Sequence, residues 1–168
     1  MKHLRSFFAV LLAAAVCAAV VLFSGCGASV QVQQLTIPGE RGSIHATLTT
    51  PANAENMPAV VICHGFTGSR SGDGHFAPLA DDLAAQGIAT VRLDFPGCGN
   101  STEPFTAYTL SNMTDDVESA ITYMQQTYGT GRTALVGHSM GGRLASLYPQ
   151  RRGGITALAL WSPANGAG

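Results

Sequence analysis

A serine stands between two glycines in the segment Gly137-His138-Ser139-Met140-Gly141. The apolar residues before this segment predict a buried strand and the residues after it predict a helix, so the serine falls at a sharp strand-to-helix turn. Gly137 and Gly141 leave room at a turn where larger side chains would clash. Such a turn holds the Ser139 hydroxyl clear of the sheet, with a helix N-terminus behind it. The segment therefore predicts a nucleophile for acyl transfer; the alternative is a serine that only caps a helix.

The hydrophobic pattern predicts the elements that position this serine. A continuous apolar run predicts a strand buried on both faces at residues 59–63, and largely apolar segments predict further buried strands at 88–93, 133–136 and 155–161. Helical spacing predicts helices at residues 76–86, 114–128 and 139–148, the last of them stopped by Pro149. Alternating residues predict an antiparallel hairpin at residues 31–37 and 43–50. Strands that alternate with helices indicate an α/β fold, with a mostly parallel, doubly wound sheet.

Two glycine-containing loops follow the first two buried strands. The first is His64-Gly65-Phe66-Thr67-Gly68, and the second runs from Asp94 to Ser101 with the pattern D-x-x-G-x-G-x-S. We interpret Asp94 as the residue that holds a tight turn, in which the glycines adopt unusual dihedral angles. With the serine segment, in this order and spacing, these motifs resemble the α/β-hydrolase superfamily of serine hydrolases. The H-G-F-T-G form, with Ser-Pro-Ala after Trp161, is most similar to feruloyl/cinnamoyl esterase-like carboxylesterases.

This resemblance covers about residues 31–165 and implies a carboxylic ester hydrolase that acts through an acyl-enzyme on Ser139. The backbone N–H groups of Phe66 and Met140 are implied as the oxyanion hole, which stabilises the negative charge of the tetrahedral intermediate. A small-molecule ester is the implied substrate. Neither a metal nor another cofactor is implied, and no feature of the sequence specifies an oligomer.

The same resemblance gives supporting roles to residues around the two loops. His64 and Gly65 are expected to shape the oxyanion loop, and Gly137 and Gly141 to shape the elbow around the serine. His64 as the catalytic base is the less favoured interpretation, because a histidine at this place in the superfamily usually supports the loop. A triad-acid role for Asp94 is disfavoured in the same way.

Serine hydrolases with this elbow take their acid and base from later in the chain, in the order Ser, Asp or Glu, His. Residues 140–168 contain no Asp, Glu or His. The expectation is therefore that this is the N-terminal part of the fold, without the lid, the last strands and the triad Asp and His, and inactive by itself. Two alternatives remain open. One is a non-catalytic surface lipoprotein that binds an acyl ligand, and the other is a serine peptidase of the same fold.

The N-terminus has the layout of a secretion signal. Lys2 and Arg5 precede an apolar run from Phe7 to Phe23, and Ser24-Gly25-Cys26 follows. The end of this segment resembles the lipobox of bacterial lipoproteins, in which the cysteine after the cleavage site is lipidated. We therefore expect a signal peptide at residues 1–26 and a hydrolase domain at 27–168. The protein is expected to be extracytoplasmic, either secreted or held at the membrane by lipid on Cys26 or by an uncleaved signal anchor.

Composition and cysteine content add two limits. The net charge is −1 and only 11% of the 168 residues are charged, so there is no electrostatic reason to expect a nucleic acid partner. Outside the leader, Cys63 and Cys98 have no metal-ligand spacing. An oxidising compartment permits a disulfide between them. The position of Cys63 at the end of an apolar run favours a small buried hydrophobic residue instead.

Overall fold

The computed structural model describes residues 29–165, so the leader assigned to residues 1–26 and its candidate lipidation site Cys26 lie outside the described residues. The elements in chain order are β1 (Val30–Pro38), β2 (Ser43–Pro51), β3 (Ala59–Cys63), η1 (Gly72–Gly74), α2 (Phe76–Ala85), β4 (Ala89–Leu93), η2 (Phe105–Ala107), α3 (Leu110–Tyr128), β5 (Thr133–His138), α4 (Met140–Arg151) and β6 (Ile155–Trp161). None of the helices in this described part is both long enough and apolar enough to cross a membrane.

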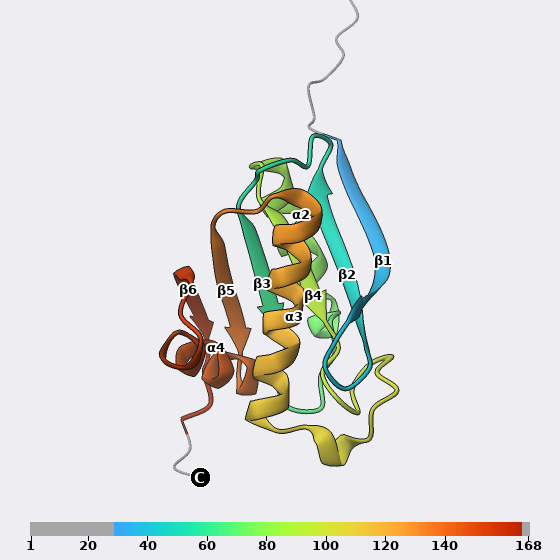
Figure 1. The fold of residues 1–168 in the computed structure, drawn as a ribbon, viewed down its shortest axis with the longest axis vertical. Helices are drawn as coiled ribbons and strands as arrows, with labels where there is room; N and C mark the ends of the chain where they lie inside the picture. Colours follow the sequence, from blue (N-terminus) through green and yellow to red (C-terminus); the bar gives the residue numbers. More distant parts are fainter. Residues whose placement is uncertain (1–28, 166–168) are drawn as a thin grey trace, which may run out of the picture.

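The strands form one sheet in the order β1-β2-β4-β3-β5-β6 (Figure 1). β1 and β2 form the predicted antiparallel hairpin, with Val30 opposite Pro51 and Pro38 opposite Ser43, and β2 also pairs antiparallel with β4. β4, β3, β5 and β6 run parallel to one another. The carboxyl ends of β3, β4 and β5 therefore lie at one edge of the sheet, where the loops that carry the three sequence motifs meet.

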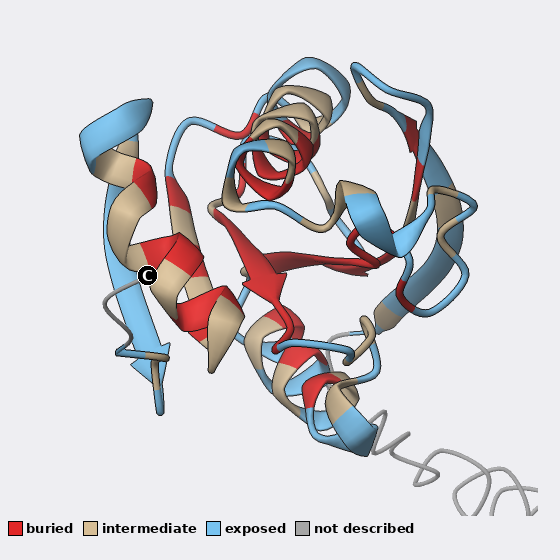
Figure 2. Ribbon diagram, turned by 90° about the horizontal axis from the view of Figure 1, so that it is seen from below, coloured by how far each residue is buried: buried red, intermediate tan, exposed pale blue. Residues whose placement is uncertain are grey.

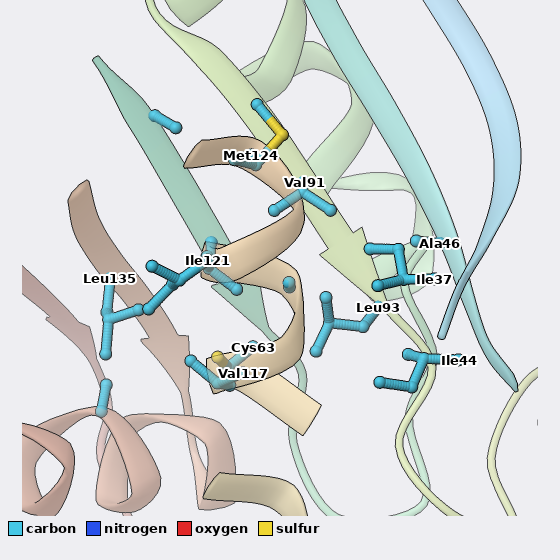
Figure 3. Close-up of a cluster of buried hydrophobic side chains, with 14 of the residues drawn as sticks. Ile37, Ile44, Ala46, Cys63, Val91, Leu93, Val117, Ile121, Met124 and Leu135 are labelled. Carbon is cyan, nitrogen blue, oxygen red and sulfur yellow. The ribbon is translucent and has the colours of Figure 1, made fainter. Parts of the chain in front are cut away.

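Helices cover both faces of the sheet, which confirms the predicted α/β class (Figure 2). α3 and α4 lie over one face, where Val117, Ile121 and Met124 of α3 belong to the same buried cluster as Val91 and Leu135 of the sheet (Figure 3). The spacing of three or four residues on α3 is the one that the sequence predicts. On the other face, Phe76 of α2 packs with β3.

The last strand differs from its prediction. The apolar run at residues 155–161 predicts a strand buried on both faces, but β6 is exposed along nearly its whole length. The side chains of Leu158 and Trp161 are 42% and 46% exposed. β6 is an edge strand that pairs only with β5 among the described residues. Its sequence has the composition of a buried strand, but its position gives it a neighbour on one side only.

Two helices also depart from their expected bounds. α3 begins at Leu110 rather than at residue 114, because the side chain of Thr109 caps it by accepting a hydrogen bond from the Asn112 amide at 3.2 Å. α4 continues through Pro149 to Arg151. A proline there removes only one hydrogen bond, and the Arg152 amide still donates to the Tyr148 carbonyl at 2.9 Å.

Cys63 and Cys98 are both free thiols, so the permitted disulfide is not formed. Cys63 is completely buried at the end of β3. Burial raises the pKa of its thiol to about 12, so the group stays protonated and unreactive at neutral pH. The interpretation of Cys63 as a small buried hydrophobic residue is the one that the structure supports.

A cluster of charges joins the β1–β2 turn to α3. Arg41 donates to Glu103 at 2.9 Å and to Asp116 at 2.5 Å, and Asp115 lies 3.8 Å from the same guanidinium. The side chain of Asp116 is only 3% exposed, and its second carboxylate oxygen has no hydrogen-bond partner among the described residues. Burial raises the pKa of Asp116 to about 6, which shows that desolvation outweighs the attraction of Arg41.

Asp116→Asn is expected to stabilise the protein near pH 7 and to have little effect near pH 4. The folded-state pKa of about 6 lies above the unfolded value of about 3.9, so the stability of the wild type falls as pH rises between these values. Asparagine resembles the protonated carboxyl group and escapes this loss, which is worth about 3 kcal/mol at neutral pH. Urea unfolding of both proteins across this pH range tests the prediction. A difference in unfolding free energy that does not change with pH would contradict it.

Candidate active site

Ser139 lies between β5 and α4 in a backbone conformation that residues with a side chain rarely adopt. Its φ and ψ are 52° and −115°, a strained combination for a residue with a Cβ. Three hydrogen bonds hold it there: its amide donates to the Trp161 carbonyl at 3.0 Å, and its carbonyl accepts from the amides of Arg143 at 3.1 Å and Ala164 at 2.9 Å. The turn is therefore fixed by β6 and the residues after it as well as by α4.

Glycines allow the elbow to pack against the oxyanion loop. A Cβ on Gly137 would lie 2.2 Å from the Gly141 carbonyl oxygen, and a Cβ on Gly141 would lie 2.2 Å from that of Cys63. A Cβ on Gly65 would lie 3.1 Å from the Cβ of Ser139. The structure thus brings the two predicted motifs into direct backbone contact, with no space for side chains between them.

His64 is buried beneath the oxyanion loop and uses both ring nitrogens there. The Phe95 amide donates to Nε2 at 3.1 Å, which leaves the proton on Nδ1, 2.7 Å from the Gly65 carbonyl that accepts it. Burial lowers the pKa of His64 and so favours the neutral ring. With both nitrogens engaged, neither is free to take a proton from Ser139, and the position fits the supporting role expected from the sequence.

Of the two candidate oxyanion donors, Phe66 lies in the oxyanion loop and Met140 in the elbow, directly after Ser139. Within residues 29–165 the amides of Phe66 and Met140 donate to no backbone or side-chain acceptor. Both N–H groups are therefore free to bind the oxygen of a ligand, as an oxyanion hole requires. The Phe66 side chain is 57% exposed and makes edge contacts with Phe105 and Tyr108, at ring-centroid distances of 5.4 and 5.5 Å.

Asp94 fixes the neighbouring loop from a buried position. Its side chain is 0% exposed and forms an ion pair with the guanidinium of Arg70. It also accepts from the amide of Arg70 at 2.7 Å and from the amide of Asn100 at 2.8 Å. Asp94 therefore ties the loop after β4 to the segment that follows the oxyanion loop. Sequence reasoning assigned the turn to Asp94 but missed Arg70, since nothing local to Arg70 indicates a partner 24 positions away.

Two hollows open beside the elbow, with Phe66 lining both. The first, here called the His75 hollow, has a volume of about 290 Å³ and includes Gly65, His138 and Trp161 in its walls. His75 and His138 face the Trp161 ring at centroid distances of 6.0 and 5.2 Å. Neither imidazole forms a hydrogen bond with Ser139 within the described residues.

The second, here called the Arg143 hollow, has a volume of about 340 Å³. It is lined by Phe66, Tyr108, Leu110, Met113, Met140 and Arg143. Sequence reasoning did not identify this site, because the residues come from three separate segments of the chain. No group of three or more His, Cys, Asp or Glu side chains in the described part is arranged to hold a metal ion.

The mostly parallel sheet and the strand-to-helix serine turn define an α/β hydrolase. Residues 58–165 match the family model described as the alpha/beta hydrolase fold, and the chain belongs to this family.

Similar proteins include enzymes of more than one class. YheT of Escherichia coli strain K12, which is named as an esterase, is 30% identical over 125 residues, 72% of this chain and 35% of its own length. Proline iminopeptidase of Saccharolobus solfataricus is 36% identical over 91 residues, 53% of this chain and 27% of its own length. The solved structure of Est1E from Butyrivibrio proteoclasticus with bound ferulic acid has a TM-score of 0.68 and 30% identity, and covers 77% of this chain and 52% of that chain. The chain thus spans about half or less of the length of these relatives.

Proposed function

We propose that this protein hydrolyses carboxylic esters of small molecules, with Ser139 as the nucleophile that forms an acyl-enzyme. The observation that carries the proposal is the conformation of Ser139, held at a φ of 52° between Gly137 and Gly141 and packed against the oxyanion loop. Strain of this kind persists where the surrounding structure enforces it, and it is typical of functional positions. Similarity to YheT and Est1E supports an ester as the substrate.

In the proposed reaction, the Ser139 oxygen attacks the ester carbonyl carbon and the carbonyl oxygen becomes negatively charged. The amides of Phe66 and Met140 donate hydrogen bonds to this oxygen, and one such donor is worth about 2.7–4 kcal/mol in the transition state. The C–O bond to the alcohol then breaks and leaves the acyl group on Ser139. Water attacks this acyl-enzyme in a second step and releases the acid.

The proton of Ser139 needs an acceptor that the described residues do not provide. No histidine in this part of the chain forms a hydrogen bond with the Ser139 hydroxyl, and His64 is fully engaged elsewhere. Loss of a triad base or acid costs a serine hydrolase about 10⁴- to 10⁶-fold in kcat. We therefore propose that the 168-residue chain holds the nucleophile and oxyanion donors but turns esters over slowly.

Turnover of p-nitrophenyl acetate and butyrate, with and without added imidazole, tests this proposal. Free imidazole serves as an external base, so the rate of the wild type above that of Ser139→Ala is expected to be small and to increase with imidazole. The Ser139→Ala variant corrects for direct hydrolysis by imidazole. Fast turnover without imidazole that is lost in Ser139→Ala would show that the chain supplies its own base. Equal rates for both proteins at every imidazole concentration would overturn Ser139 as the nucleophile.

Within residues 29–165 Ser139 has no hydrogen-bonded base, which also favours a second candidate function, the binding of an acyl ligand without catalysis. In that case an ester binds equally to the wild type and to Ser139→Ala, and neither protein turns it over.

A peptidase of the same fold is a third candidate, favoured by the similarity to proline iminopeptidase. Comparison of prolyl-p-nitroanilide with p-nitrophenyl butyrate distinguishes it. Export of the chain and lipid attachment at Cys26 stay proposals.

A further inference from the structure

The Arg143 hollow begins where an ester would react. Two of its lining residues, Phe66 and Met140, carry the amides that we propose as oxyanion donors. A carbonyl oxygen held by those amides places its carbon at the mouth of the hollow, so one arm of the ester enters it. With a volume of about 340 Å³, the hollow has room for a chain of several carbons.

The walls of the hollow are mostly apolar, with one charged side chain among them. Leu110, Met113, Met140 and the rings of Phe66 and Tyr108 form most of the lining, and Arg143 supplies the one guanidinium. The apolar residues favour a hydrocarbon segment through the area that it removes from water. A guanidinium at the same wall favours a ligand with an anionic group, because its planar set of donors matches a carboxylate.

Arg143 is one of four arginines that form no ion pair in the described part of the chain, and of these (Arg92, Arg132, Arg143 and Arg151) it is the one that lines this hollow. The position of Arg143 makes the lack of a carboxylate partner more costly. Arg143 lies at the start of α4, where the helix dipole is positive, and the first turn of α4 contains no acidic residue. A cation is unfavourable at this end of a helix. The electrostatic arrangement therefore favours an anion from outside the protein.

We propose that Arg143 is a specificity-determining residue, which selects esters whose longer arm is apolar and ends in a carboxylate. The arm lies in the Arg143 hollow, with the carboxylate on the guanidinium and the ester carbonyl at the Phe66 and Met140 amides. This inference rests on the proposed function for the position of the reacting carbonyl.

Binding to the Ser139→Ala variant tests this inference without requiring catalysis. Monomethyl adipate and dimethyl adipate have the same six-carbon chain and differ in one terminal carboxylate. We expect isothermal titration calorimetry to give a dissociation constant about tenfold lower for the monoester. Adding Arg143→Gln to the Ser139→Ala variant is expected to abolish the preference for the monoester and leave the affinity for the diester unchanged. Arg143→Lys is expected to retain part of it, since lysine keeps the charge but not the planar geometry.

Arg151→Gln is the matched control, because Arg151 is exposed at the other end of the same helix. It should leave the tenfold preference unchanged. Equal binding of the two esters, absence of binding by both, or a preference that survives Arg143→Gln would each overturn the inference. Failure of the proposed function gives a different result: if Ser139 is not the nucleophile, the wild type and Ser139→Ala show equal rates in the imidazole experiment, while the preference for the monoester persists.

Discussion

Replacing Gly141 by alanine is expected to destabilise the protein by at least about 3 kcal/mol. The added Cβ would lie 2.2 Å from the carbonyl oxygen of Cys63 and 2.6 Å from that of His64. Both are backbone atoms at the end of a buried strand, so no side-chain rotation relieves the clash. The elbow and the oxyanion loop would have to move apart, and the relative positions of Ser139 and the Phe66 amide would change with them.

Gly131→Ala is the matched control for this substitution. Gly131 is exposed in the loop before β5, and a Cβ there meets no atom within 4 Å. Its effect is expected to stay within about 0.5 kcal/mol. Urea unfolding of the three proteins, or their soluble yield if Gly141→Ala does not fold, compares the two sites. Similar stabilities for the two variants would show that the close contact at Gly141 is not required.

The elements of the sheet centre could be predicted from sequence because local composition and final position agree there. The apolar run 59–63 lies between two strands and under helices on both faces, and β3 has those same bounds. At β6, local composition and final position disagree. The segment of β6 is also largely apolar, but it lies at the edge of the sheet. Strand order is a property of the whole fold, and a seven-residue apolar segment does not contain it.

The candidate site divides in a similar way. Ser139, Gly137 and Gly141 could be identified because the elbow is a local turn, in which each residue type reflects the space available within the segment itself. Arg143 and Arg70 could not be identified from the sequence. Their surroundings come from loops that are distant in sequence, so their importance depends on the arrangement of β3, β4 and α4. A sequence pattern identifies a turn more readily than it identifies the walls of a hollow.

Asp94→Ala is expected to cost about 3–5 kcal/mol, the range found when one partner of a buried ion pair is removed. The carboxylate is completely buried and accepts from two backbone amides, those of Arg70 and Asn100, besides its ion pair with the Arg70 side chain. Alanine would leave these donors without their acceptor and the Arg70 guanidinium without its counter-charge. Asp94→Asn keeps one acceptor oxygen and should therefore fall between the wild type and Asp94→Ala.

Asp82→Ala provides the comparison, since Asp82 is exposed on α2 and its carboxylate forms no ion pair in the described part of the chain. Its effect on the free energy of unfolding is expected to be within about 0.5 kcal/mol. The loop held by Asp94 adjoins the oxyanion loop through Arg70 and through the Phe95 amide that bonds to His64. Loss of the carboxylate should therefore also increase hydrogen exchange at the amides of His64 and Phe95. Protection unchanged at these amides, despite the loss of stability, would show that the two loops are held independently.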